Sequence, residues 1–285
     1  MGFLDKLFKG RRLNLRPMRF AGMLYPADAD ALEAQIAAYL AQNASQPPVP
    51  ESPMAGAKPR ALIVPQAEYE FAGETMGAGY REVRDAGGPI ERVVLVGSSR
   101  LVPFRGVAVT RLEGFETPLG PVVIDTEHVE ALLGAQKVRA IEPAFEPEGS
   151  LEVQLPFLKA VLDDFAVVPL LVGDVSDEEL AGLLEPYLGE TTTLVVVSAN
   201  MSHDTPALRA DELDEELCKA IEALDPEPIG REHSHGRSAI RGLLRAAAER
   251  GLSAQRLARS TSADAVEVEE AVGGPVTGYG AFVLV

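Results

Sequence analysis

The feature that most constrains the fold of this chain is a series of short apolar runs that lack polar alternation. Four of these runs predict strands, at residues 61–65, 92–97, 166–172 and 193–198. Helical patterns lie between them, at residues 73–86, 126–134, 150–164 and 176–188. Strands that are apolar on both sides are buried on both faces, which favours a mostly parallel sheet flanked by helices. We therefore predict a protein of the α/β class.

The rest of the chain extends this pattern without starting a second core. We expect helices at 207–224 and 237–250, a closing strand at 279–285, and a β-hairpin at 115–125 on the edge of the sheet. The length of 285 residues, 46% of them hydrophobic, suits one large domain. We predict a basic N-terminal arm at 1–20 followed by a single domain at 21–285.

Charge is distributed unevenly along this acidic protein. The net charge is −17, yet residues 1–20 hold six basic side chains against Asp5, which leaves −22 for the remainder. An acidic chain of this kind argues against a nucleic-acid partner. The first residues place apolar side chains at helical spacing beside lysines, which is typical of a short interfacial helix. Residues 1–16 could thus make a weak membrane-surface contact; the alternatives are a frayed tail or a tail packed on the acidic body.

The cellular location is predicted from cysteine content and from the absence of targeting patterns. Cys218 is the only cysteine, so one chain cannot form an intramolecular disulfide. No apolar run approaches the roughly 18 to 20 residues of a membrane-spanning helix, and no secretory signal is evident at the start. We expect a cytoplasmic protein in which Cys218, next to Leu217, lies in the core.

Three of the predicted strands end in polar or glycine-rich turns. These turns are residues 65–69, 97–100 and 198–204. In parallel α/β sheets, side chains and loops converge at the carboxyl edge, where ligands bind. The three turns are therefore the expected position of a functional site.

The same turns lie within or beside a set of short sequence motifs that follow one another in a fixed order over most of the chain. They are Ala21-Gly-Met-Leu-Tyr-Pro-Ala-Asp28, Ala61-Leu-Ile-Val-Pro65, Val94-Leu-Val-Gly-Ser-Ser99, Val102-Pro-Phe-Arg-Gly106, Phe115-Glu-Thr-Pro-Leu-Gly120, Ser150-Leu-Glu-Val-Gln-Leu-Pro-Phe-Leu158, Val168-Pro-Leu-Leu-Val-Gly173, Val196-Val-Ser198 with Ser202-His203, and Gly278-Tyr-Gly-Ala-Phe282. In this order the chain resembles the Memo family, whose bacterial and archaeal members are often called AmmeMemoRadiSam system protein B. The resemblance implies a dioxygenase-like α/β fold, similar to that of extradiol non-haem iron dioxygenases.

The resemblance also implies a metal site of His, His and Cys, with a further His and an Asp-x-x-His pair at the strand ends. In this chain most of those positions differ: Gln66, Arg100 and Gly149 stand for histidines, Asn200 for the aspartate and His235 for the cysteine. His203 is unchanged. Nearby, Glu68 and Ser98 also depart from the family pattern, while Glu148, Ser150, Gly236 and Arg237 keep it. The chain thus looks like a divergent member with a degenerate metal site.

The replacements change what the site can bind. Divalent metals need lone-pair donors such as imidazole, thiolate or carboxylate. Arg100 offers none, Gln66 is a poor ligand for iron or copper, and Gly149 has no side chain. We therefore expect no cofactor. A guanidinium would instead organise a carboxylate, phosphate or sulfate by bidentate hydrogen bonds.

Several interpretations of the altered site remain open. The first is a binding or scaffold protein whose ligand-binding cleft takes a small anion, a peptide or a protein at Gln66, Glu68, Arg100, Asn200, His203 and His235. Oriented N–H groups of a helix that starts near residue 236 would assist it. In the second, Arg100 forms an internal ion pair with Glu68 that closes the cleft. In the third, the former ligand positions have simply relaxed, with His203 as a satisfied polar residue and His233 as a solvated turn residue.

The rival to all of these is a metal-dependent oxidoreductase with rearranged ligands. His203, His235 and a carboxylate drawn from Glu68, Glu148 or Asp204 would hold iron, copper or zinc. His233 could join His235 as a chelating pair if the segment were extended. The sequence favours the non-catalytic binding protein over this alternative.

Overall fold

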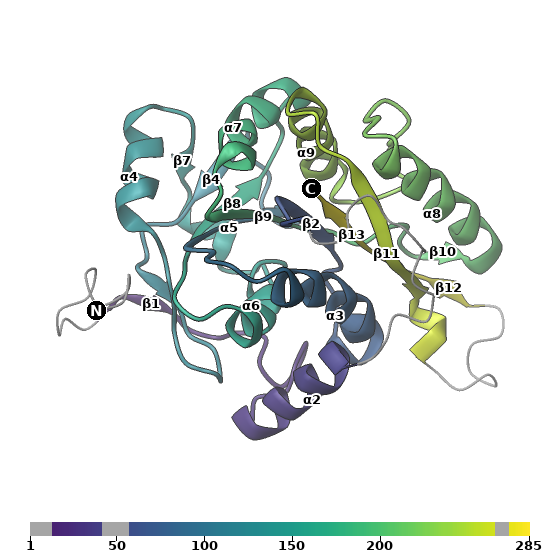
Figure 1. Cartoon of the computed structure of the whole chain (residues 1–285), viewed down its shortest axis with the longest axis horizontal. Helices are drawn as coiled ribbons and strands as arrows, with labels where there is room; N and C mark the ends of the chain where they lie inside the picture. Colours follow the sequence, from purple (N-terminus) through teal and green to yellow (C-terminus); the bar gives the residue numbers. More distant parts are fainter. Residues whose placement is uncertain (1–12, 42–56, 266–273) are drawn as a thin grey trace.

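The computed structural model describes residues 13–41, 57–265 and 274–285, and it places an eight-stranded mixed sheet at the centre (Figure 1). The strands follow the order β11-β13-β2-β9-β3-β8-β4-β7. Their bounds are Ala254–Thr261 (β11), Gly278–Leu284 (β13), Ala61–Val64 (β2), Thr193–Ser198 (β9), Arg92–Ser98 (β3), Ala166–Val172 (β8), Val107–Val109 (β4) and Arg139–Ala140 (β7). The central strands β2, β9, β3 and β8 are mutually parallel and almost wholly buried, as the apolar runs predict.

Antiparallel strands extend this parallel centre on both sides. β13 pairs antiparallel with β2, and β11 pairs antiparallel with β13, while on the other side β4 pairs antiparallel with β8. The sequence pattern did not predict β11, because its residues are only partly buried and include Arg256 and Arg259. The predicted α/β class with a mostly parallel central sheet is confirmed.

Helices cover both faces of the sheet. Their bounds are Ala29–Ala41 (α2), Tyr69–Ala86 (α3), Thr126–Gly134 (α4), Glu142–Phe145 (α5), Leu155–Val161 (α6), Asp177–Gly189 (α7), Ala207–Glu222 (α8) and Arg237–Glu249 (α9), with short 3-10 turns at Glu152–Gln154 (η1) and Ser262–Ala265 (η2). α3 packs on β2, β13 and β11, with α2 and α6 beside it, whereas α7 and α9 pack together over β9 and β3. The capping box of Ser176 and Glu179 starts α7 where the sequence predicts it. The helix expected at 150–164 is shorter, because it begins with η1 and ends at Val161.

The predicted hairpin forms, but it does not lie at the edge of the main sheet. β5 (Gly114–Phe115) pairs antiparallel with β6 (Val122–Val123), and β1 (Leu15–Arg16) adds to β5 in parallel, so the three make a separate small sheet. A second small sheet joins β10 (Thr205–Pro206) to β12 (Pro275–Val276). Residues 15 and 16, which we predicted to belong to a basic arm, are thus part of a strand.

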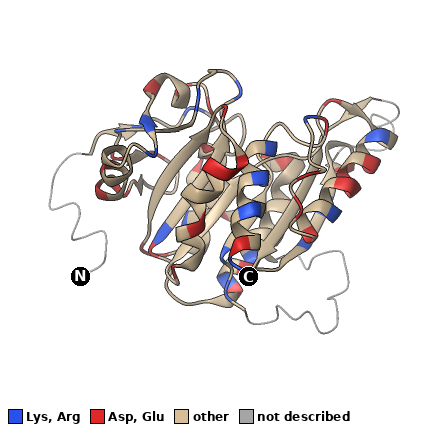
Figure 2. Ribbon diagram, turned by 90° about the horizontal axis from the view of Figure 1, so that it is seen from above, with Lys and Arg blue, Asp and Glu red and all other residues tan. Residues whose placement is uncertain are grey.

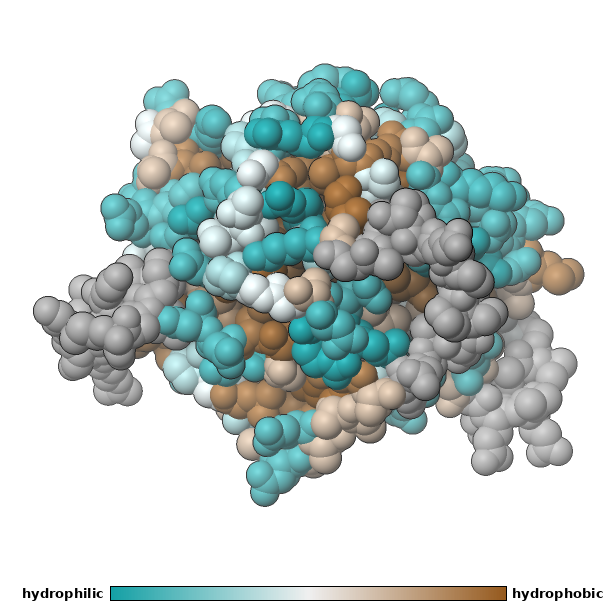
Figure 3. Space-filling view, in the orientation of Figure 1, coloured by the Kyte–Doolittle hydropathy of each residue, from teal (hydrophilic) through white to brown (hydrophobic). Residues whose placement is uncertain are grey.

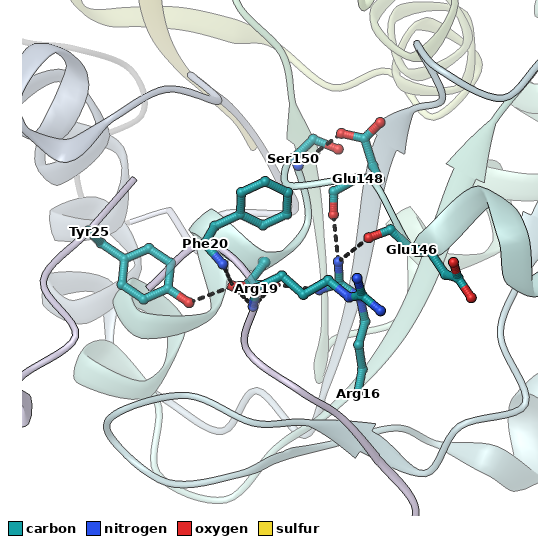
Figure 4. A network of polar contacts seen from close by, with 8 residues as sticks. Arg16, Arg19, Phe20, Tyr25, Glu146, Glu148 and Ser150 are labelled. Carbon is teal, nitrogen blue, oxygen red and sulfur yellow. Dashed lines mark hydrogen bonds and ion pairs between the residues drawn. The ribbon is translucent and has the colours of Figure 1, made fainter. Parts of the chain in front are cut away.

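A buried ion pair holds this N-terminal segment in place (Figure 4). The Arg16 guanidinium lies 2.5 Å from Glu152 Oε2 and donates to the carbonyl of Glu148, with side-chain exposures of 5% for Arg16 and 0% for Glu152. The other carboxylate oxygen accepts the backbone N–H of Arg19 and of Phe20 and the hydroxyl of Tyr25. The described part of the predicted arm is therefore packed on the domain, and its first residues, 1–12, lie outside the described residues.

Charged residues lie mainly on helices and loops around a largely uncharged sheet (Figure 2). On the face seen in Figure 3, polar residues surround several apolar patches. Within the described ranges no helix combines the length and apolar character needed to cross a membrane.

Candidate functional site

The turns after β2 and β9 are joined directly at the carboxyl edge of the sheet. The backbone N–H of Gln66 donates to Asn200 Oδ1 at 2.7 Å, and Asn200 Nδ2 donates to the Gln66 carbonyl at 3.1 Å. This reciprocal pair forms because β2 and β9 are neighbouring parallel strands whose ends lie at the same level. The Asn200 side chain is thus a structural link between two turns, a role that the sequence did not reveal.

The start of α9 is attached to the same place. Ser234 Oγ donates to the Asn200 carbonyl at 2.6 Å and accepts from the Gly236 N–H at 2.9 Å. Gly236 also lies against Ala199, because a Cβ added there would be 2.6 Å from the Ala199 Cβ. These contacts bring His235 and the first turn of α9, which has no side-chain cap, to the ends of β2 and β9. Sequence reasoning missed Ser234, although its position one residue before His235 placed it near the site.

Two histidines lie close together beside this helix start, within electrostatic reach of two arginines. The rings of His203 and His235 have centroids 5.0 Å apart, and His203 Nδ1 lies 3.0 Å from Thr277 Oγ1. Partial burial lowers the pKa of His235, and the positive charges of His203, Arg100 and Arg237 lower it further. We call Gln66, Arg100, Asn200, His203 and His235 the edge cluster.

Arg100 has no described carboxylate as an ion-pair partner, so the predicted pair with Glu68 is wrong. Glu68 precedes the first residue of α3 and is exposed. It lies close enough to Tyr279 on β13 to add to the effect of burial, which raises the pKa of that tyrosine to about 12. The physical reason is strand order: β13 flanks β2 on the side away from β9 and β3, so Glu68 lies away from Arg100.

The alternative in which His233 and His235 form a chelating pair on an extended segment is also wrong. His233 is 5% exposed, its Nδ1 accepts the Gly230 N–H at 3.0 Å, and its Nε2 lies 3.1 Å from Glu216 Oε2. The segment is a turn rather than a strand, so the two side chains do not share a face. His233 is therefore a buried structural residue, not a solvated one.

The remaining acidic and thiol groups have local roles. Glu148 is buried and its Oε1 accepts the N–H of Ser150, as Figure 4 shows. Asp204 takes the left-handed conformation at φ 51° in the turn after His203. Burial raises the pKa of Cys218 to about 11, so its thiol is protonated at neutral pH.

The donor set does not fit the metal centre that the resemblance implies. His203 and His235 supply two imidazoles, but no group of three or more His, Cys, Asp or Glu residues in the described ranges is arranged to hold a metal ion. A side chain at Gly149 would meet Phe20 and Leu24, each 3.2 Å from the added Cβ. The positive charges of Arg100 and Arg237, which act on His235, also oppose the binding of a cation by that imidazole.

An α/β sheet with parallel central strands and a polar cluster at their carboxyl ends is typical of proteins that bind or act on a ligand at the strand ends. A family model described as Memo-like protein matches residues 16–272, and the chain belongs to this family.

Relatives of known name agree with this family. The chain is 32% identical to a MEMO1 family protein of Archaeoglobus fulgidus, over 91% of this chain and 97% of that protein. It is 32% identical to a MEMO1 family protein of Aquifex aeolicus, over 76% and 78%, and 30% identical to Protein MEMO1 of Danio rerio, over 77% and 74%. Among solved structures, an uncharacterized protein from Escherichia coli K12 is similar over 78% of this chain and 98% of that chain, with a TM-score of 0.46 and 15% identity.

Proposed function

We propose that this protein is a non-catalytic member of the Memo family that binds a small anion at the edge cluster, with Arg100 as the principal charge. The observation that carries the proposal is the local excess of positive charge in a chain of net charge −17. Arg100 and Arg237 both lower the pKa of His235, and neither forms an ion pair with a described carboxylate, although the Asp177 carboxylate that pairs with Arg241 also raises the pKa of Arg237. Cations gathered in an acidic protein without partners of their own are typical of an anion site.

The chemistry of the cluster suits an organic anion. The Arg100 guanidinium can donate two parallel hydrogen bonds to a carboxylate or phosphate. The first turn of α9 adds the positive end of the helix dipole and those N–H groups that lie beyond Gly236 and Arg237, whose own N–H groups are bonded to Ser234. Leu101, 68% exposed, follows Arg100 directly and offers an apolar contact beside the charge. These features support an anion that carries a carbon skeleton.

Binding of anions to the purified protein tests the proposal. Acetate, glycolate, phosphate and sulfate are titrated by calorimetry into the wild type and into Arg100→Gln. Loss of one charge-assisted pair is expected to weaken binding by about tenfold or more, since such bonds contribute roughly 1.5–3 kcal/mol. Arg105→Gln is the matched control, because it removes the same charge from an exposed residue of the same loop. Equal affinities in the two variants, or no binding of any anion by the wild type, would contradict the proposal.

The oxidoreductase alternative retains one favourable observation, the 5.0 Å separation of the His203 and His235 rings. It predicts stoichiometric uptake of iron, copper or zinc, lost in His203→Ala or His235→Ala. Such a result, measured by metal analysis after reconstitution, would favour the enzyme over the binding protein.

We also propose a cytoplasmic location, which the single free, buried cysteine supports.

A further inference from the structure

Asp214 is a carboxylate on the buried face of α8. It is 1% exposed, and its neighbours on that face are the apolar residues Ala210, Leu213 and Leu217. Burying a carboxylate costs free energy unless polar groups replace the water that it loses. The groups that contact Asp214 therefore indicate why an acidic residue stands at this position.

The first contact is with the turn that follows β9. The backbone N–H of Ser202 donates to Asp214 Oδ1 at 2.9 Å, and Ser202 is itself fully buried. The two residues are twelve positions apart, so this bond attaches the middle of α8 to the turn. Ser202 directly precedes His203 in the chain.

The second contact is with the start of β13. A Cβ added at Gly278 would overlap Asp214 Oδ2, so the carboxylate lies against the Gly278 backbone and leaves no room for a side chain there. Gly278 is in turn bonded to the turn after β9: its carbonyl accepts the N–H of Met201 at 2.9 Å, and its N–H donates to the Ser202 carbonyl at 2.9 Å. Asp214 thus lies where α8, β13 and this turn meet.

Both segments that Asp214 contacts hold His203. One of them carries Ser202, the residue before His203, and the other carries Thr277, whose Oγ1 lies 3.0 Å from His203 Nδ1. His203 is exposed, so burial does not fix its ring. Its place beside His235, with ring centroids 5.0 Å apart, depends instead on these two neighbours.

We infer that Asp214 is a positioning residue that holds His203 in the edge cluster through Ser202 and Gly278. Asp214 is too deeply buried to touch a ligand, so it acts only through these residues. The inference goes beyond the proposed function, because it concerns how the edge cluster is built. Only the binding part of its test rests on the proposed anion site.

Nuclear magnetic resonance of the ¹⁵N-labelled full chain reports on His203 directly. The chain has four histidines, and the ring signals of His203 are identified by their loss in His203→Gln. In Asp214→Ala these signals should shift toward those of free histidine, because the turn is no longer attached to α8. The signals of His128 on α4 should stay unchanged. Asp214→Asn keeps an acceptor oxygen and the size of the side chain, so it should retain the wild-type signals.

Anion binding gives the second measurement. Acetate, titrated by calorimetry, should bind to Asp214→Ala about threefold to tenfold more weakly than to the wild type, the effect of losing one hydrogen bond. Asp214→Asn should bind it as tightly as the wild type does. Asp211→Ala is the matched control, because Asp211 lies on the same helix but is exposed and pairs with Arg259. This control should change neither the ring signals nor the affinity.

Thr277→Val tests the same connection without disturbing a buried charge, in case Asp214→Ala does not fold. It removes only the hydroxyl next to His203 and should also shift the ring signals of that histidine. Unchanged His203 signals in Asp214→Ala or Thr277→Val, or an equal shift of His128, would overturn the inference. Equal acetate affinities of the wild type and Asp214→Ala would do the same. Absence of anion binding by the wild type would instead overturn the proposed function, and the ring signals would still decide the role of Asp214.

Discussion

Glu152 offers the sharpest test of how the N-terminal segment is held to the domain. Both of its carboxylate oxygens accept hydrogen bonds: Oε2 from Arg16, and Oε1 from the N–H groups of Arg19 and Phe20 and from the hydroxyl of Tyr25. Substitution Glu152→Gln keeps the shape of the side chain. It replaces one acceptor oxygen by an NH₂ group that would face these donors, and it leaves the buried Arg16 without a counter-charge.

The structure sets the expected size of the effect. Removing one partner of a buried ion pair costs about 3–5 kcal/mol, because the other charge remains buried and uncompensated. Arg84 and Asp85 provide the contrast, since that pair has side-chain exposures of 42% and 57%, and an exposed pair contributes about 0–1 kcal/mol. We therefore expect Glu152→Gln to lower the free energy of unfolding several times more than Arg84→Met.

Urea unfolding followed by far-ultraviolet circular dichroism measures the difference, and the chain has no tryptophan to report by fluorescence. The double variant Glu152→Leu/Arg16→Leu should lose less than the sum of its single variants, because neither charge is then left alone. A loss below about 1 kcal/mol in Glu152→Gln, or strict additivity in the double variant, would refute the reasoning.

Two further predictions concern helix packing and pH. In α7 a Cβ at Gly182 would meet nothing within 4 Å, whereas in α9 a Cβ at Gly242 would lie 2.6 Å from Leu180. Gly182→Ala should therefore raise the free energy of unfolding by about 0.5–1 kcal/mol, and Gly242→Ala should lower it by about 1–3 kcal/mol. The melting temperature should shift in the same directions, and shifts of the same sign for both variants would count against the described α7–α9 packing. His128, whose Nε2 lies 2.7 Å from the Tyr187 hydroxyl, has its pKa lowered from 6.5 by burial and by Arg92. Its contribution to stability is fully present above pH 6.5 and is lost as the pH falls through the lowered value, so the difference in stability between wild type and His128→Phe should shrink on acidification; a difference independent of pH would contradict this.

Much of the central fold could be predicted from the sequence because it depends on local apolar patterning. The runs at β3, β8 and β9 are apolar on both faces, and such strands are stable only inside a layered α/β domain. The prediction of a candidate site at the carboxyl edge follows from the same architecture. β11 was not predicted because its residues are nearly all partly buried, without an apolar run, and because its pairing with β13 is a long-range contact.

The composition of the edge cluster was only partly accessible. Four members of the edge cluster could be grouped because they follow strands or lie in sequence motifs shared with a family: Gln66, Asn200, His203 and His235. The sequence also left open an ion pair of Glu68 with Arg100 and a chelating pair of His233 with His235, and the structure forms neither. Opposite charge or matching side-chain type does not fix the distance between two residues. That distance depends on which strands lie between the residues and on how the backbone turns.

The sequence by itself thus determined the α/β class and the family, since both depend on residue types and their order, and it predicted the loss of most metal-ligand positions. Only the tertiary structure decided which altered positions face one another. It attached Asn200 to Gln66, brought α9 to the strand ends, turned His233 inward to Glu216, and left Arg100 beside two histidines without a described carboxylate partner. The physical reason is that a site is made by contacts between residues far apart in the chain, and strand order and helix packing select those contacts.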